Sequence, residues 1–283
     1  MKTINIAGVP EHFNLPWQLC IENGEFEEIG IDLQWTDVPE GTGKMCQMLR
    51  DKETDIAVIL TEGIVKDIVA GNDCSIVQVY VESPLIWGIH VVANSKYNAL
   101  ADLENTKVAI SRYGSGSHLM AYVNAQNQNW NTENLQFEIV NTIEGAVEAL
   151  TNSSADYFMW ERFMTKPLVD KGVFRRVADC PTPWPCFVIA VRNGFLEANE
   201  QSVALLLETI NNTTIEFRNI PSIDRTLASR YNLKSEDVKE WLSLTKWSQK
   251  PLAEKVLNNI QNQLFDLKII DKKGTFAEIV KAV

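Results

Sequence analysis

The sequence predicts an α/β protein of two lobes, each with a mixed, mostly parallel sheet flanked by helices. Three observations lead to this fold class. Short apolar strands alternate with helical periods, the chain contains an internal repeat, and two β-rich segments connect the repeated halves. The length of 283 residues agrees with two domains of roughly 150 residues each.

The internal repeat sets Ile4 on Val108, an offset of 104 residues that continues through the next elements. After a three-residue deletion the match resumes, with Asp55 on Asp156. Each copy has the order strand, helix, strand, amphipathic helix, strand, which is typical of parallel α/β units. The repeat therefore predicts that both lobes share one plan.

The repeated elements follow from these patterns in chain order. The first copy is expected at Ile4–Gly8, Leu15–Asn23, Ile31–Asp37, Gly43–Lys52 and Asp55–Leu60. The second copy is expected at Lys107–Ser111, Ser117–Gln126, Leu135–Asn141, Ile143–Asn152 and Asp156–Trp160. Helical spacing predicts four more helices in the last third, at Leu205–Arg218, Ile223–Tyr231, Ser235–Trp247 and Leu252–Leu267.

Two segments carry the chain between the lobes. Val77–Asn94 contains two β-rich runs interrupted at Ser83-Pro84, and Thr182–Arg192 places prolines before a further strand. We therefore expect one lobe from residues 1–86 plus 188–283 and the other from 87–187, with a two-strand hinge and a ligand cleft between them. Closure of the lobes around a ligand is the motion expected of such a hinge.

Composition and charge narrow the possible partners. A net charge of −11 would repel a phosphate backbone, so nucleic acid is excluded as the expected partner. No run approaches the roughly 18 apolar residues of a membrane span. The five cysteines form no CxxC pair, which argues against a disulfide framework and against a metal site. We expect a monomer that carries no cofactor and no metal.

The beginning of the sequence bears on where the protein acts. Met1 leads directly into alternating strand residues, with no basic region, apolar stretch and cleavage site. The expectation for the sequence as it stands is a cytoplasmic protein. A periplasmic protein or lipoprotein is the alternative if a leader was removed.

Two segments resemble a known family. VPEGTGKMCQMLRDKETDIAVILTEG (residues 38–63) and ALADLENTKVAISRYGSGSH (residues 99–118) are similar to type II periplasmic binding proteins. The nearest branch includes alkanesulfonate, nitrate and taurine binders and the pyrimidine-precursor proteins of thiamin synthesis, and the chain is most similar to a leaderless, stand-alone group within it. The resemblance implies a solute-binding protein for an aromatic, heterocyclic or sulfonate-like ligand, with an ABC-type permease as its partner.

Ligands of open α/β sheets bind beyond the carboxyl ends of the strands, which selects the candidate residues. Glycines and serines in the Arg112–Ser117 turn precede a helix and could cradle a small anion, although a Ser N-cap explains them too. The complete set of ligand-binding candidates is His12, Phe13, Thr42, Gly43, Thr61, Glu62, Ser83, Arg112, Tyr113, Ser115, Ser117, Trp160, Glu161 and Trp184.

Carboxylates and aromatic residues in this set suggest a ligand class. Glu62 and Glu161 each follow a third strand, where they favour an amine, an amidine or a protonated heterocycle. Trp160 lies beside Glu161 in sequence, and an aromatic face next to a carboxylate suits a flat cation. Solvated carboxylates and core aromatics remain the alternative interpretation of all these residues.

A second functional class is an enzyme on the same fold, since a fold does not fix a function. Enzymes of thiamin-pyrimidine and menaquinone biosynthesis resemble this architecture. Catalysis would need an acid–base pair or a nucleophile, for which His12 with Glu11 or Glu62, or Cys46 near a helix start, are candidates. No catalytic spacing accompanies them, so no residue is predicted as catalytic and binding is the favoured function.

Overall fold

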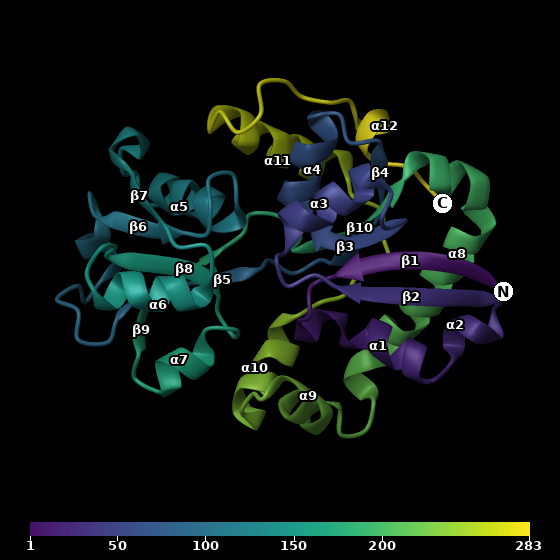
Figure 1. Cartoon of the computed structure of the whole chain (residues 1–283), viewed down its shortest axis with the longest axis horizontal. Helices are drawn as coiled ribbons and strands as arrows, with labels where there is room; N and C mark the ends of the chain where they lie inside the picture. Colours follow the sequence, from purple (N-terminus) through teal and green to yellow (C-terminus); the bar gives the residue numbers. More distant parts are fainter. The chain divides into compact units, whose positions relative to one another are not determined.

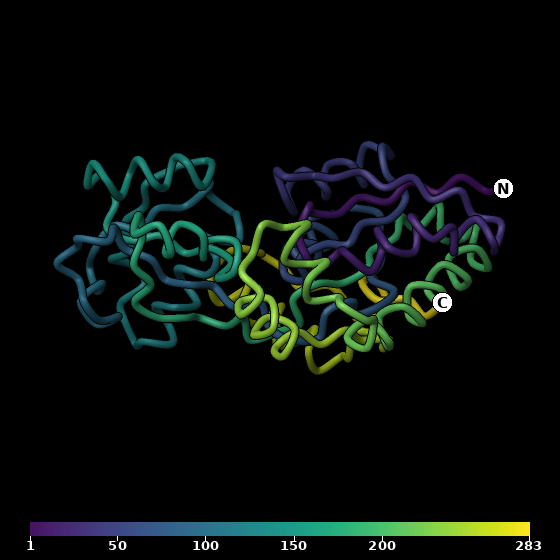
Figure 2. Tube along the Cα trace, turned by 90° about the horizontal axis from the view of Figure 1, so that it is seen from below, coloured from purple at the N-terminus to yellow at the C-terminus, as the bar shows by residue number.

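The computed structural model describes residues 1–283, and the chain divides into two compact units. The first unit consists of residues 1–83 and 184–283, and the second of residues 84–183. The sequence placed these boundaries a few residues further along the chain. Both termini lie in the first unit, and the last third of the chain returns to it (Figure 1 and Figure 2).

The first unit contains a five-stranded sheet in the order β2-β1-β3-β10-β4. Strands β1, β2 and β3 run parallel, and β10 runs antiparallel to both of its neighbours. Strands β3, β4 and β10 are almost wholly buried, which agrees with their apolar runs, whereas the edge strand β2 has exposed positions. The strands are β1 (Lys2–Gly8), β2 (Ile31–Asp37), β3 (Ile56–Leu60), β4 (Cys74–Val81) and β10 (Phe187–Arg192).

The second unit repeats this plan in the order β7-β6-β8-β5-β9. Its three parallel strands are β6, β7 and β8, and β5 runs antiparallel between β8 and β9. In both sheets the antiparallel strand is the one that follows a crossing between the units. The strands are β5 (Ile86–Val92), β6 (Lys107–Ile110), β7 (Gln136–Ile139), β8 (Tyr157–Glu161) and β9 (Phe174–Pro181).

Strand pairing gives the true register of the repeat. Ile6 is the first residue of β1 that pairs with both β2 and β3, and Val108 is the first residue of β6 that pairs with both β7 and β8. The two residues are therefore equivalent, and the offset between the first strands is 102. The predicted offset of 104 was wrong by two residues at this strand. The error is invisible in the apolar pattern because side chains alternate between faces with a period of two. The match of Asp55 with Asp156 is in the observed register.

Helices cover both faces of each sheet. In the first unit α1, α2 and α8 pack together on one face, and α3, α4 and α11 pack on the other (Figure 1). In the second unit α6 packs on the face that carries Ala109 and Phe158. The helices are α1 (Leu15–Glu22), α2 (Glu25–Glu28), α3 (Thr42–Asp51), α4 (Thr61–Val69), α5 (Gly116–Asn127), α6 (Ile143–Thr151), α7 (Lys166–Asp170), α8 (Asn193–Glu216), α9 (Ile223–Tyr231), α10 (Ser235–Leu244), α11 (Glu254–Asp266) and α12 (Phe276–Ile279). None of them combines the length and the apolar character that crossing a bilayer requires.

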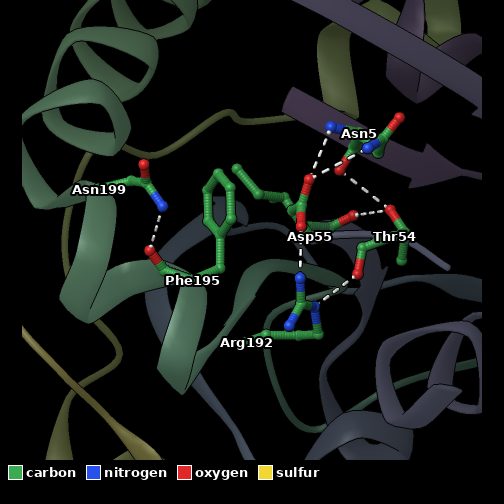
Figure 3. A network of polar contacts seen from close by, with 7 residues as sticks. Asn5, Thr54, Asp55, Arg192, Phe195 and Asn199 are labelled. Carbon is green, nitrogen blue, oxygen red and sulfur yellow. Dashed lines mark hydrogen bonds and ion pairs between the residues drawn. The ribbon is translucent and has the colours of Figure 1, made fainter. Parts of the chain in front are cut away.

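An aspartate ties the strand starts together in each unit. Asp55 accepts the backbone N–H of Asn5 at 3.0 Å and pairs with Arg192 at 2.5 Å, and Arg192 also donates to the Thr54 carbonyl (Figure 3). The equivalent Asp156 accepts the backbone N–H of Lys107 at 2.8 Å. Asp55 is buried and Asp156 is half-buried, and each directly precedes the third strand and bonds to a backbone N–H of the first, which supports the common register of the two strands.

The long helix α8 bends close to this network. Asn199 has non-helical backbone angles, φ −142° and ψ 25°, inside the helix. Its side-chain amide donates to the Phe195 carbonyl at 2.8 Å, which satisfies one acceptor near the bend (Figure 3). The expected helix Leu205–Arg218 is therefore only the later part of a longer, bent helix.

Candidate functional site

The candidate residues divide between the two units. His12, Phe13, Thr42, Gly43, Thr61, Glu62, Ser83 and Trp184 belong to the first unit. Arg112, Tyr113, Ser115, Ser117, Trp160 and Glu161 belong to the second. Within each unit most of them follow the carboxyl ends of parallel strands, where ligands of α/β sheets bind.

Glu62 is a buried carboxylate at the end of β3. Helix α4 starts directly after the strand, so Glu62 lies in the first helical turn and is only 3% exposed. The indole N–H of Trp184 donates to its Oε2 atom at 2.8 Å. Loss of hydration on burial raises the pKa of Glu62 to about 7, although hydrogen bonds to the carboxylate and the charge of Lys66 oppose the shift.

Thr61 and Thr42 shape the backbone around Glu62. The Thr61 hydroxyl donates to the Pro185 carbonyl at 2.7 Å, which holds the start of α4 against the segment that leads into β10. Thr42, the first residue of α3, lies against Gly63, where an added Cβ atom would approach the Thr42 methyl group to 2.3 Å. The starts of α3 and α4 are therefore in contact, with Gly43 exposed on the first turn of α3.

Aromatic rings surround His12 at the end of β1. His12 is fully buried, and its ring centroid lies 4.4 Å from Trp241, 4.8 Å from Phe13 and 5.9 Å from Tyr231. Burial lowers the pKa of His12 to about 3, so its imidazole is neutral at physiological pH. Loss of hydration also raises the pKa of the adjacent Glu11 to about 7.

Phe13 links this aromatic group to the strand that begins near Trp184. Its ring lies 5.3 Å from that of Phe187, the first residue of β10, and Phe187 pairs with Leu60 at the end of β3. The structure therefore brings His12, Phe13, Glu62 and Trp184 to one edge of the first sheet. Ser83 lies beside the same segment, where its carbonyl accepts the Cys186 N–H and its hydroxyl accepts the Lys246 N–H.

The serines of the Arg112–Ser117 turn bond to one another. Ser115 is the N-cap of α5: it accepts the His118 N–H at 3.3 Å and donates to the Arg112 carbonyl at 2.7 Å. The Ser117 hydroxyl accepts the Ser111 N–H at 2.9 Å and lies 3.1 Å from the Ser115 hydroxyl. This arrangement matches the N-cap interpretation of the turn rather than an open anion cradle.

Arg112 and Tyr113 stand at the surface of the second unit. Arg112 is exposed, and Tyr113 is 63% exposed with its ring against those of His118 and Phe137. A guanidinium in water contributes less to binding a small anion than a buried one does, because water screens its charge. The anion-cradle interpretation of this turn therefore stays a prediction, with Arg112 exposed on its own unit.

Trp160 and Glu161 are not brought together by the fold. As consecutive residues of β8 they point to opposite faces of the sheet. The Trp160 ring stacks on Phe158 at 5.4 Å and packs against the core on the α6 face. Glu161 is 5% exposed and accepts the Met164 N–H at 2.7 Å. The expected aromatic platform beside this carboxylate is absent at Trp160.

Three residues near His12 and Glu62 were missing from the candidate set: Phe187, Tyr231 and Trp241. Trp241 is 2% exposed and comes from α10, far along the chain from the His12 and Phe13 rings that it contacts. Its helical spacing from Val238 predicts burial, but no local pattern identifies His12 as its neighbour.

The structure also bears on the proposed nucleophile and on metal binding. Burial, reinforced by Asp67 and Cys74, raises the pKa of the Cys46 thiol well above its ordinary value, so no thiolate is present at neutral pH. All five cysteines are buried and free. No group of three or more His, Cys, Asp or Glu side chains is arranged to hold a metal ion.

Comparisons with known proteins agree with this geometry. Residues 87–180 match the family model described as Ca3427-like PBP. The structure is similar to that of the Candida albicans CA3427 gene product, which is described as having the generic periplasmic binding protein fold, at 23% identity over 99% of this chain and 96% of that chain, with a TM-score of 0.89. No curated protein matches the sequence.

Two sulfonate-binding proteins share the same architecture. The alkanesulfonate-binding protein SsuA from Xanthomonas axonopodis pv. citri, bound to MOPS, is 16% identical over 100% of this chain and 99% of its own, with a TM-score of 0.83. The aliphatic sulphonate binding protein SsuA from Escherichia coli is 18% identical over 99% of this chain and 92% of its own, with a TM-score of 0.80. Together the comparisons confirm the type II periplasmic binding protein fold that the resemblance implied.

Proposed function

We propose that this protein, a chain of the type II periplasmic binding protein fold with a Ca3427-like second unit, closes its two lobes around a small organic ligand. The proposal includes a role in an ABC-type uptake system, in which the liganded form binds a permease. Recovery of a membrane permease with the tagged protein in the presence of ligand would support that role, and recovery of none from membranes that express the cognate system would oppose it.

Glu62 carries the proposal for the ligand's chemistry. With a pKa of about 7, the buried Glu62 carboxyl gains an ionic partner when a cation approaches, and the cation in turn is held away from water. Aromatic side chains on the same edge provide flat apolar contacts. We therefore favour a flat amine, amidine or protonated heterocycle as the ligand.

A sulfonate-like ligand is the competing choice, because the two sulfonate binders share the fold. Such a ligand needs enclosed donors or positive charge. In the Arg112–Ser117 turn the serine hydroxyls bond within the loop and the guanidinium is exposed, whereas the first unit presents carboxyls. The distribution of charge thus favours the cationic ligand over the anionic one.

The test compares two probes on three proteins by thermal unfolding at pH 7.5. Benzamidine should raise the melting temperature of the wild type, and Glu62→Gln should weaken its binding about tenfold or more because the ionic partner is lost. Glu208→Gln is the matched control, since Glu208 is exposed on α8. A melting temperature raised by butane-1-sulfonate and left unchanged by benzamidine would overturn the assignment of the ligand class.

A second candidate function, catalysis on a small molecule, is favoured by one observation. Glu11, His12 and Glu62 have shifted pKa values at one edge of the sheet, and such shifts cluster at active sites. A pKa of about 3 makes His12 a weak base, which is why binding ranks first. Mass spectrometry of a molecule retained through native purification, before and after prolonged incubation, would distinguish an unchanged ligand from a substrate.

A further inference from the structure

Trp184 is held on several sides at the point where the chain re-enters the first unit. Its indole N–H donates to Glu62, and its neighbours Pro183 and Pro185 restrict the backbone because each proline fixes its own φ angle. Trp184 is 3% exposed, so its ring has little freedom to leave this position. The hydrogen bond therefore joins a buried acid to a restrained segment of chain.

The segment around Trp184 is itself bonded to two other parts of the first unit. The Thr61 hydroxyl donates to the Pro185 carbonyl at 2.7 Å, and the Thr61 N–H donates to the Cys186 carbonyl at 3.1 Å. The Cys186 N–H donates to the Ser83 carbonyl at 3.2 Å, where the chain leaves the same unit. Both crossings of the chain are thereby connected to the first turn of α4.

An indole N–H is a donor and never an acceptor, so its partner must be an acceptor. It stabilises the ionised form of Glu62 more than the protonated form, because hydrogen bonds to charged acceptors are stronger. The indole N–H also occupies the Oε2 atom of Glu62, so the Oε1 atom has the larger part of the carboxylate's remaining acceptor capacity. Lys66, one helical turn further along α4, is the charged group that acts on Glu62 in the same direction.

We infer that Trp184 is the positioning residue of the ligand site: it orients the Glu62 carboxylate and favours its ionised form, and so sets the preference for a cationic ligand. The inference rests on the proposed function for the identity of the ligand, but not for the effect on Glu62.

The experiment is a titration of Glu62 by carbon-13 NMR of protein labelled at the glutamate carboxyl carbons. Glu62→Gln identifies the Glu62 signal by its disappearance. Trp184→Phe keeps an aromatic ring and removes the N–H, and should raise the Glu62 midpoint by about one pH unit or more. Trp130→Phe, in the second unit, is the matched control and should leave the midpoint in place.

Ligand binding gives the second readout. Trp184→Phe should weaken benzamidine binding about threefold or more at pH 7.5, with part of the affinity recovered at pH 9, where the carboxyl ionises again. If Trp184 only stabilised the fold around the site, the benzamidine affinity of Trp184→Phe would not recover at pH 9. Should Trp184→Phe fold poorly, Thr61→Val serves instead, since it loosens the segment and keeps the indole, with a smaller shift in the same direction.

The outcomes separate the inference from the proposed function. An unchanged Glu62 midpoint in Trp184→Phe overturns the positioning role, whatever the ligand. A raised midpoint in a protein that binds no benzamidine at any pH supports the positioning role and refutes the proposed ligand class. A raised midpoint with the pH-dependent loss of affinity supports both.

Discussion

The two units have the same strand order but different chemistry beyond the ends of their parallel strands. In the first unit His12, Phe13 and Glu62 are buried, aromatic rings surround His12, and the pKa values of His12 and Glu62 are strongly shifted. In the second unit Arg112 and Tyr113 are exposed and the serine hydroxyls bond to one another. The comparison teaches that a repeated frame places equivalent turns at the same edge of each sheet, whereas the side chains in those turns differ in burial and bonding between the units.

Removal of one aromatic side chain from each unit should show the difference between the units most strongly. Trp241 is buried against His12 and Phe13, so Trp241→Ala should lower the free energy of unfolding by about 3–5 kcal/mol. Tyr113 is mostly exposed, and Tyr113→Ala should stay within about 0.5 kcal/mol of the wild type. Urea unfolding followed by circular dichroism measures both; similar losses for the two variants would contradict the contrast in burial.

The pH dependence of stability should isolate the carboxyls of the first unit. Glu62 has a pKa of about 7 in the folded protein and 4.5 as its ordinary value, so between these pH values the folded state binds a proton that the unfolded state has released. Glu62 alone should therefore lower the free energy of unfolding by about 3 kcal/mol as the pH rises from about 4.5 to about 7.

Glu62→Gln removes this contribution and should flatten the pH profile. Glu11, whose pKa is also raised to about 7, acts in the same direction, so the Glu11→Gln and Glu62→Gln double variant should give the flattest profile. Urea unfolding at pH 4, 5.5, 7 and 8 provides the measurement. A Glu62→Gln profile parallel to that of the wild type over this range would show that burial does not oppose ionisation of Glu62.

Local patterns were sufficient for most elements of the fold. Ile31–Asp37 and Ile223–Tyr231 have the predicted bounds, because alternation and helical spacing are properties of neighbouring residues. Helix α4 was missed, and its first turn was interpreted as a loop at Thr61-Glu62, because it follows β3 with no linking residues. The sequence does not predict strand β9 because two half-buried arginines and an exposed aspartate interrupt its apolar residues.

The site was harder to predict than the fold because its decisive contacts are distant in sequence. The carboxylate of Glu62 and the indole of Trp184 lie 122 residues apart along the chain, and only the fold makes them partners. Carboxylates are usually solvated, so no local signal marks Glu62 as buried. Trp160 and Glu161 show the opposite case: they are adjacent in sequence, but consecutive residues of a strand have side chains on opposite faces.

The smallest expected effect tests the equivalent turns of the two units. Ser115→Ala removes the N-cap of α5 and should cost about 1 kcal/mol, since one backbone N–H loses its acceptor. In the first unit α3 has no side-chain cap, and Gly41 before it has φ 76° and ψ −157°, a conformation open essentially to glycine alone. Gly41→Ala should therefore cost about 1–3 kcal/mol of stability. The cost is backbone strain alone, since no atom lies within 4 Å of the added methyl group.

Urea unfolding and benzamidine binding of Ser115→Ala test whether the Ser115 hydroxyl stabilises the fold or contacts a ligand. Ser115 donates to the Arg112 carbonyl and accepts from His118, so its hydroxyl is used within the folded loop. Loss of stability in Ser115→Ala, with benzamidine binding unchanged, would show that the Ser115 hydroxyl stabilises the fold and does not contribute to binding of this ligand. If Ser115→Ala unfolded at the same urea concentration as the wild type, the cap would contribute little to stability, and the expected cost of about 1 kcal/mol would be wrong.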